Sequence, residues 1–159
     1  MSTVLELAAL LRERQWMLAT AESCTGGMIA SACTDVAGSS EWFDCGLVSY
    51  SYESKTELLG VEPRMLQEHG AVSEVVARAM AFGAVRRSRA RVAVAVTGIA
   101  GPGGGMPHKP VGTVWFAFMV DGVLTSEMRR FDGDRAGVRR ATVQHALQGL
   151  VDRIGRTAA

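Results

Sequence analysis

The sequence predicts an α/β protein, a three-layer α/β/α sandwich whose mixed sheet has about five strands. Short apolar runs that suit buried strands alternate with longer segments whose apolar residues recur at helical spacing. The dipeptide Asp121-Gly122 then joins the last two predicted strands as a hairpin, which makes the sheet mixed rather than purely parallel. At 159 residues, 48% of them hydrophobic, the chain is expected to be a single domain over residues 1–159 with its own core.

The predicted strands differ in how strongly their sequences specify them. Residues 91–97 alternate Val with Ala, which favours a central strand covered on both faces. Residues 42–50 are rich in aromatic residues and Val, and Gly46 within them indicates a bulge or a close backbone approach. The remaining strands are predicted at residues 16–21, 111–120 and 123–131.

Helices are predicted where apolar residues recur at helical spacing after a capping residue. Ser73 is expected to cap one helix, and Asp132 or Asp134 the last one. Ser51 has Ser54 rather than Glu three residues later, so no capping box with Glu is expected there. The predicted helices cover residues 4–13, 28–33, 51–60, 62–69 and 74–88, followed by a last helix whose apolar face extends to residue 154.

Charge and cysteine content exclude several classes of protein. The formal net charge of +1 argues against nucleic-acid binding through bulk electrostatics, and the basic run at residues 86–91 is interpreted as a solvated helix end. The cysteines Cys24, Cys33 and Cys45 lack the spacing of a disulfide framework or a metal site. We therefore expect reduced thiols in a cytoplasmic protein without a metal. Without a signal-peptide pattern or a membrane-length apolar stretch, no membrane partner is expected either.

The turn after the first predicted strand contains a candidate nucleophile, Ser23. A serine hydroxyl becomes nucleophilic when a base takes its proton. The amides of Thr25, Gly26 and Gly27 could stabilise an oxyanion or hold a phosphate at the start of the next helix. The alternative is a structural turn, in which Ser23 or Thr25 caps the helix and the glycines permit close packing. Cys24 is a weaker candidate for the nucleophile.

The sequence favours lysine over histidine as the base. His69 and His145 fall in predicted helices, and His108 lies in a glycine-rich loop without further support. Lys55 and Lys109 are the only lysines, against fifteen arginines. A partly desolvated lysine can act as a base at neutral pH, whereas arginine cannot. Two ordinary surface lysines are the alternative.

Two further segments are candidates for ligand binding. Five of the eight residues from Gly98 to Gly105 are glycine, and this loop follows a buried strand, with the hydroxyl of Thr97 beside it. It matches neither a Walker P-loop nor GxGxxG, and a flexible connection is the alternative.

Arg135, Arg139 and Arg140 fall in the first turns of the last helix, where cations are electrostatically unfavourable. An anionic ligand would explain this placement; solvent-exposed side chains are the alternative.

These motifs resemble the CinA C-terminal domain family, in order and over nearly the whole chain. The motifs that carry the resemblance are AESCTGG at 21–27, GLVSYS at 46–51 with Lys55, GAVS at 70–73, TGIAGPGG at 97–104, KPVGTV at 109–114 and GDR at 133–135 with Val138-Arg139. The chain departs from the family pattern at Tyr52, where many relatives have Asn, and at Met106 and His108, where Thr and Glu are common. These departures bear on the shape of the substrate pocket.

The resemblance implies the stand-alone form of a nicotinamide-nucleotide amidohydrolase. Such an enzyme converts nicotinamide mononucleotide and water to nicotinate mononucleotide and ammonia in pyridine nucleotide recycling, without a cofactor. The alternative is a non-catalytic nucleotide-binding protein of the competence or damage-inducible kind. The resemblance also leads us to expect a homo-oligomer.

The resemblance further implies roles for individual residues. Ser23 would be the nucleophile, and Lys55, with Tyr50 nearby, would be the base. Arg139 would hold the 5′-phosphate or orient the substrate, although which arginine binds the phosphate is left open. The remaining substrate-binding residues would be Thr25, Gly26, Gly27, Thr97, Gly101, Gly103 and Gly104.

Overall fold

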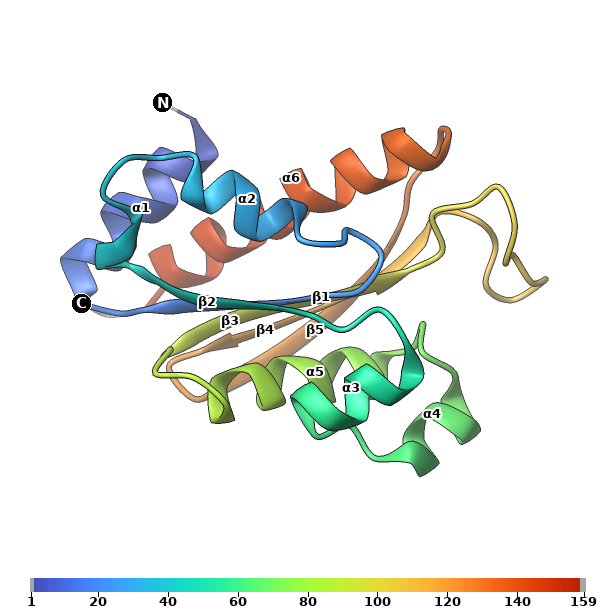
Figure 1. The fold of residues 1–159 in the computed structure, drawn as a ribbon. Helices are drawn as coiled ribbons and strands as arrows, with labels where there is room; N and C mark the ends of the chain where they lie inside the picture. Colours follow the sequence, from blue (N-terminus) through green and yellow to red (C-terminus); the bar gives the residue numbers. More distant parts are fainter. Residues whose placement is uncertain (1, 158–159) are drawn as a thin grey trace.

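The computed structural model describes residues 2–157, which form a five-stranded sheet between two layers of helices (Figure 1). The helices are α1 (Thr3–Arg14), α2 (Met28–Thr34), α3 (Tyr52–Leu59), α4 (Pro63–His69), α5 (Glu74–Arg86) and α6 (Arg135–Gly155), with a short 3-10 helix at Ser39–Glu41. The strands are β1 (Leu18–Glu22), β2 (Phe43–Val48), β3 (Val92–Gly98), β4 (Thr113–Val120) and β5 (Val123–Arg130). Helices α1, α2 and α6 cover one face of the sheet and α3, α4 and α5 the other, which confirms the predicted architecture (Figure 1).

The strand order is β2-β1-β3-β4-β5. Strand β1 pairs in parallel with β2 and β3, whereas β4 is antiparallel to both β3 and β5, so the sheet is mixed as predicted. In the central strand β3, the three valines Val92, Val94 and Val96 pack on the side of α1 and α6. The alternating Ala93 and Ala95 pack with the alanines of α5, because small side chains let that helix approach the sheet closely.

Gly46 in β2 marks a close approach between three elements. A Cβ atom at Gly46 would lie 2.9 Å from the Oγ1 atom of Thr20 in β1 and 3.0 Å from the Cβ atom of Ala30 in α2. The β1–β2 register also shifts between Leu18 and Ala19. The prediction drawn from this glycine is therefore confirmed: a larger residue would push α2 away from the sheet.

Helix caps follow the sequence with one exception. The side chains of Ser73 and Asp134 accept hydrogen bonds from the first turns of α5 and α6, as predicted. At α3 the box is not formed with Glu, as predicted, but two serines form a capping box that the sequence did not lead us to expect. The Ser54 hydroxyl takes the place of the usual Glu carboxylate, since its Oγ atom lies 3.1 Å from the Ser51 amide and the Ser51 hydroxyl accepts from the Ser54 amide in return.

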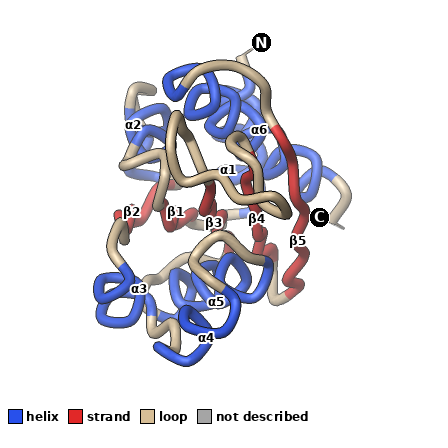
Figure 2. The backbone as a smooth tube through the Cα atoms, turned by 90° about the vertical axis from the view of Figure 1, so that its right-hand side faces the viewer, coloured by secondary structure: helices blue, strands red, loops and turns tan. Residues whose placement is uncertain are grey.

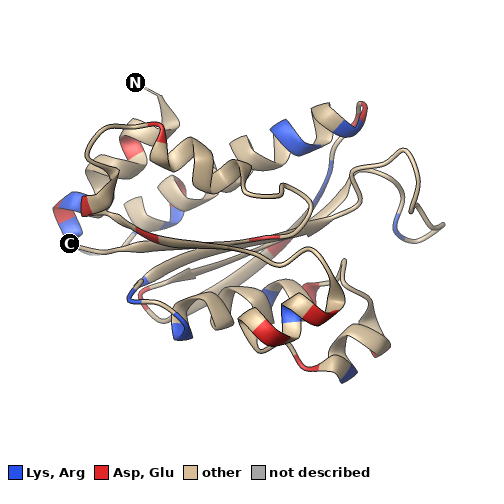
Figure 3. Cartoon of the chain, viewed as in Figure 1, with Lys and Arg blue, Asp and Glu red and all other residues tan. Residues whose placement is uncertain are grey.

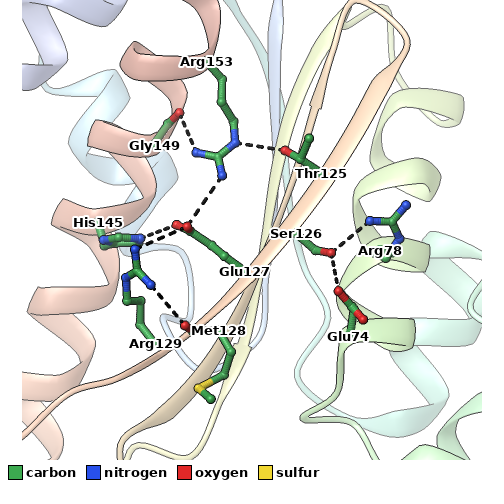
Figure 4. A network of polar contacts seen from close by, with 10 residues as sticks. All are labelled: Glu74, Arg78, Thr125, Ser126, Glu127, Met128, Arg129, His145, Gly149 and Arg153. Atoms are coloured by element: carbon green, nitrogen blue, oxygen red, sulfur yellow. Dashed lines mark hydrogen bonds and ion pairs between the residues drawn. The ribbon is translucent and has the colours of Figure 1, made fainter.

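Strand β5 lies at the edge of the sheet and is tied to both helical layers by polar contacts (Figure 4). On one side, Glu127 contacts His145 and Arg153 of α6. On the other side, the Ser126 hydroxyl donates to the Glu74 carboxylate of α5 at 2.7 Å. Successive residues of a strand point to opposite faces, so adjacent residues of β5 reach opposite layers.

The parallel strands bring the candidate functional loops together at one end of the sheet, where β1, β2 and β3 have their carboxyl ends. Figure 2 looks onto this end, where the loops after these strands meet the beginning of α6. Within residues 2–157, none of the helices combines the length and apolar composition needed to cross a membrane.

Candidate active site

Ser23 and Lys55 are in direct contact at the carboxyl ends of the parallel strands. The Nζ atom of Lys55 lies 2.9 Å from the Oγ atom of Ser23, although 32 residues separate them in the sequence. Ser23 follows β1, and Lys55 is on α3, which begins just after β2. The backbone amide of Ser49 donates to the carbonyl of Glu22, so the pairing of β1 with β2 continues to the point where the two residues meet.

The surroundings of Lys55 favour its neutral form. Its side chain is 1% exposed, and this burial lowers the pKa of Lys55 to about 8. Among residues 2–157, Lys55 forms no salt bridge with a carboxylate. Its Nζ atom instead lies 2.7 Å from the Ser49 carbonyl oxygen and 3.3 Å from that of Tyr50. In the neutral amine these two carbonyls can accept both hydrogens, which leaves the lone pair toward the Ser23 hydroxyl.

A fully buried carboxylate, that of Glu22, supports the turn that carries Ser23. It accepts hydrogen bonds from the Thr25 hydroxyl and from the amides of Ile29 and Ala30, at 2.9 and 3.0 Å for the two amides. Glu22 thus satisfies amides in the first turn of α2 that the strand–turn–helix pattern would otherwise offer to a ligand. The sequence analysis did not single out Glu22. The feature of the sequence that could have indicated Glu22 is a lone acidic residue at the end of an apolar strand.

The amides around the nucleophile divide into two groups. The amide of Gly26 donates to the Ser23 carbonyl at 3.1 Å and is used within the turn. Gly26 and Gly27 have φ angles of 59° and 106°, a conformation that requires glycine here. The amides of Cys24 and Thr25 donate to no oxygen atom of the described residues 2–157. These amides, rather than that of Gly26, are available to a developing oxyanion.

A cavity of about 280 Å³ opens in front of the Ser23–Lys55 pair. Its lining includes four of the predicted substrate-binding residues: Thr97, Gly101, Gly103 and Gly104. The other four predicted substrate-binding residues, Thr25, Gly26, Gly27 and Arg139, are outside the lining. Among the described residues, the charged side chains of its lining are those of Lys55 and Arg135.

The glycine-rich loop forms one wall of this cavity. The Thr97 hydroxyl donates to the Ala71 carbonyl at 2.9 Å and so joins the end of β3 to the segment before α5. Within the described part of the chain, the amides of Ala100, Gly101, Gly103 and Gly104 donate to no acceptor. This wall therefore offers several unused donors to a ligand.

Arg139 binds the back of the nucleophile turn. Its Nε atom donates to the Cys24 carbonyl at 3.0 Å and its Nη2 atom to the Thr25 carbonyl at 3.2 Å. A Cβ atom at Gly26 would lie 3.4 Å from the same Nη2 atom, so the guanidinium packs against the turn. The structure thus gives Arg139 a bracing contact between α6 and the turn.

Arg135 lies one turn earlier on α6 and lines the cavity. Its Nη1 atom donates to the Gly101 carbonyl at 3.0 Å and its Nη2 atom to the Tyr50 hydroxyl at 3.1 Å. Figure 3 shows basic segments at the beginning of α6, on the side of the molecule where the loops converge. Arg140 instead lines a separate surface groove with Asp35.

The other candidate catalytic groups are poorly placed or poorly ionised. Burial raises the pKa of the Cys24 thiol to about 11, so its nucleophilic thiolate is scarce at neutral pH. His69 and His108 are absent from the cavity lining, and His145 contacts Glu127 between α6 and β5 (Figure 4). The described residues contain no group of three or more His, Cys, Asp or Glu side chains that could hold a metal ion.

Comparison with known proteins gives consistent matches. The model of the CinA C-terminal domain family matches residues 2–154. Nicotinamide-nucleotide amidohydrolase PncC of Enterobacter agglomerans is 51% identical over 144 residues, which is 90% of this chain and 88% of the relative. A CinA-like protein of Akkermansia muciniphila is 54% identical over 143 residues, covering 89% of this chain but 34% of the longer relative.

A solved structure of a related protein has the same fold as this chain. The competence/damage inducible protein CihA of Agrobacterium tumefaciens superimposes with a TM-score of 0.89 at 45% identity, over 98% of each chain.

Proposed function

Because the chain belongs to the CinA C-terminal domain family, we propose that it hydrolyses the carboxamide of nicotinamide mononucleotide to give nicotinate mononucleotide and ammonia. Amidohydrolase is the activity that the names of its curated relatives carry. The observation that carries the proposal is the 2.9 Å contact between the Lys55 Nζ and Ser23 Oγ atoms beside a cavity. A hydroxyl next to a desolvated base is the arrangement that amide hydrolysis through a covalent intermediate requires.

In the first half of the proposed reaction, neutral Lys55 takes the proton of the Ser23 hydroxyl while the Oγ atom attacks the carboxamide carbon. The free amide of Cys24, next to the nucleophile, supports binding of the oxyanion that forms. Protonated Lys55 then donates its proton to the leaving nitrogen. The C–N bond breaks, ammonia departs, and a nicotinoyl ester remains on Ser23.

In the second half, Lys55 is neutral again and takes a proton from a water molecule. The resulting hydroxide attacks the ester carbon, and the Ser23 Oγ atom leaves and recovers its proton from Lys55. The acid that forms loses its proton to solvent, and the product leaves as a carboxylate, nicotinate mononucleotide. The hydrogen bonds from Lys55 to the Ser49 and Tyr50 carbonyls hold the amine in place through both steps.

An ammonia-release assay tests the proposal. Purified protein is incubated with nicotinamide mononucleotide, nicotinamide riboside or nicotinamide, and the products are separated chromatographically. We expect ammonia and nicotinate mononucleotide from the first compound, and none from the Ser23→Ala variant. Tight binding of nicotinamide mononucleotide with no ammonia over a long incubation would contradict the proposed reaction and favour a non-catalytic nucleotide-binding protein.

We further propose a cytoplasmic enzyme that self-associates. The substrate is a metabolite of pyridine nucleotide recycling, and Cys24, Cys33 and Cys45 are free thiols. Phe82 of α5 and Val123 of β5 are large apolar side chains that are 50% and 64% exposed, and burying them between copies would be favourable. Light scattering coupled to gel filtration measures the mass in solution; a mass near 16.9 kDa would contradict self-association.

A further inference from the structure

We infer that Arg135 is the residue that recognises the terminal phosphate of the substrate, and that it sets the preference for a nucleotide over the corresponding nucleoside. This inference rests on the proposed function, since it names the group that selects the substrate of the same site. A phosphomonoester is a dianion with several acceptor oxygens, and a guanidinium binds it through charge-assisted hydrogen bonds.

The contacts of the two neighbouring arginines assign them different tasks. Both hydrogen bonds of Arg139 go to carbonyls of the nucleophile turn, and Arg139 is outside the cavity lining. Arg135 lines the cavity, and its side chain is exposed to solvent. A guanidinium has five N–H donors. The two contacts with the Gly101 carbonyl and the Tyr50 hydroxyl leave donors of Arg135 available.

Tyr50 connects the reacting group with this arginine. Its carbonyl oxygen lies 3.3 Å from the Lys55 Nζ atom. Its hydroxyl, at the other end of the residue, lies 3.1 Å from the Arg135 Nη2 atom. One residue, Tyr50, thus contacts both the catalytic amine and the guanidinium. In nicotinamide mononucleotide a ribose separates the carboxamide-bearing ring from the phosphate, so a substrate whose amide reaches Ser23 can place its phosphate at Arg135.

The charge of the cavity suits an anion. Among the described residues, Arg135 is the lining side chain that stays charged at neutral pH, beside the titratable amine of Lys55, and no Asp or Glu lines the cavity. Because Lys55 is engaged with Ser23 and two carbonyls, Arg135 is the cation available to a distal anionic group. The unused amides of Gly103 and Gly104 lie along the same wall and can donate to the remaining phosphate oxygens.

The test measures binding and turnover separately. Calorimetric titrations with nicotinamide mononucleotide and with nicotinamide riboside use Ser23→Ala protein, with and without Arg135→Gln, so that no substrate is consumed. Arg140→Gln is the matched control, because Arg140 is an exposed arginine of the same helix outside the cavity lining. Steady-state kinetics on both compounds then use the same arginine variants with Ser23 intact.

We expect Arg135→Gln to weaken binding of nicotinamide mononucleotide by about tenfold or more, the loss typical of a charge-assisted contact. Its kcat/KM ratio between nucleotide and riboside should fall by a similar factor, mainly through KM, while Arg140→Gln leaves the ratio unchanged. Inorganic phosphate should compete with the nucleotide in protein that retains Arg135 and lose that effect in Arg135→Gln.

Two results overturn the inference: nucleotide binding that is indifferent to Arg135→Gln, or equal losses for nucleotide and riboside. A different result is expected if the proposed amidohydrolase function is wrong but the role of Arg135 is right. In that case the wild-type protein releases no ammonia, while nucleotide binding still depends on Arg135.

Discussion

The Lys55 Nζ atom lies 2.9 Å from the Ser23 Oγ atom, and both side chains are buried at the bottom of a cavity. Lys55 forms no salt bridge within the described residues, and its other contacts are to carbonyl oxygens. Burial without a counter-charge favours the neutral amine. This relationship leads to the first two predictions.

Replacement of Lys55 should abolish ammonia release without unfolding the protein. Lys55→Met removes the base and keeps the length of the side chain, and we expect kcat to fall by about 10³-fold or more. Lys55→Arg should be equally inactive, because arginine stays protonated at neutral pH. Lys109→Met is the matched control, since Lys109 is the only other lysine and its Nζ atom contacts the His69 carbonyl. Activity of Lys55→Met within about threefold of the wild type would exclude the lysine base.

Activity should depend on the protonation of Lys55. Burial lowers the pKa of Lys55 to about 8, and the neutral form is the active one. We therefore expect kcat/KM to fall about tenfold per pH unit below this pKa and to level off above it. A profile measured from about pH 6 to pH 9.5 on nicotinamide mononucleotide locates the transition. A flat profile over that range would show that no group with such a pKa controls the reaction.

Glu22 should matter for the stability of the protein. Glu22→Ala leaves the amides of Ile29 and Ala30 and the Thr25 hydroxyl without their acceptor. We expect the free energy of unfolding to fall by about 3 kcal/mol or more, because each of three buried donors is left without an acceptor. Glu22→Gln keeps the size and one acceptor oxygen, so its loss should be smaller. Urea unfolding at neutral pH measures both, and equal midpoints for all three proteins would contradict this role.

The contact between Glu127 and His145 should make stability depend on pH. Burial opposes ionisation of Glu127, but His145, Arg153 and Arg129 outweigh it and hold the pKa of this carboxyl below its ordinary value. The stability that this provides is therefore present above the ordinary pKa of glutamate and is lost as the pH falls through the lower folded-state value.

Glu127→Gln should accordingly lower the free energy of unfolding by about 1 kcal/mol at neutral pH. The difference from the wild type should shrink in acid, where the wild-type carboxyl is protonated too. Thermal unfolding of both proteins across this pH range measures the effect. A difference that is constant down to acidic pH would show that the pair does not act through charge.

Local sequence determined the elements and much of the candidate site. Hydrophobic spacing, the Asp121-Gly122 turn and the capping residues depend on neighbours within a few positions, so the strands, helices and hairpin could be predicted from the sequence. The capping box that was not expected is local too, because Ser54 takes the place of the usual glutamate three residues after Ser51. The serine between a strand and two glycines made Ser23 a candidate nucleophile, and the scarcity of lysine made Lys55 and Lys109 candidate bases. The choice of Lys55 came from the resemblance to the family.

Only the tertiary structure decided how these residues are used. Parallel pairing of β1 with β2 brings Ser23 to Lys55 across 32 residues, and no local pattern encodes that distance. The direction of each side chain on α6 likewise separates Arg139, which braces the turn, from Arg135, which lines the cavity. Sequence thus supplied the chemical groups, whereas the sheet and the helix packing fixed their distances, their burial and hence the pKa of Lys55.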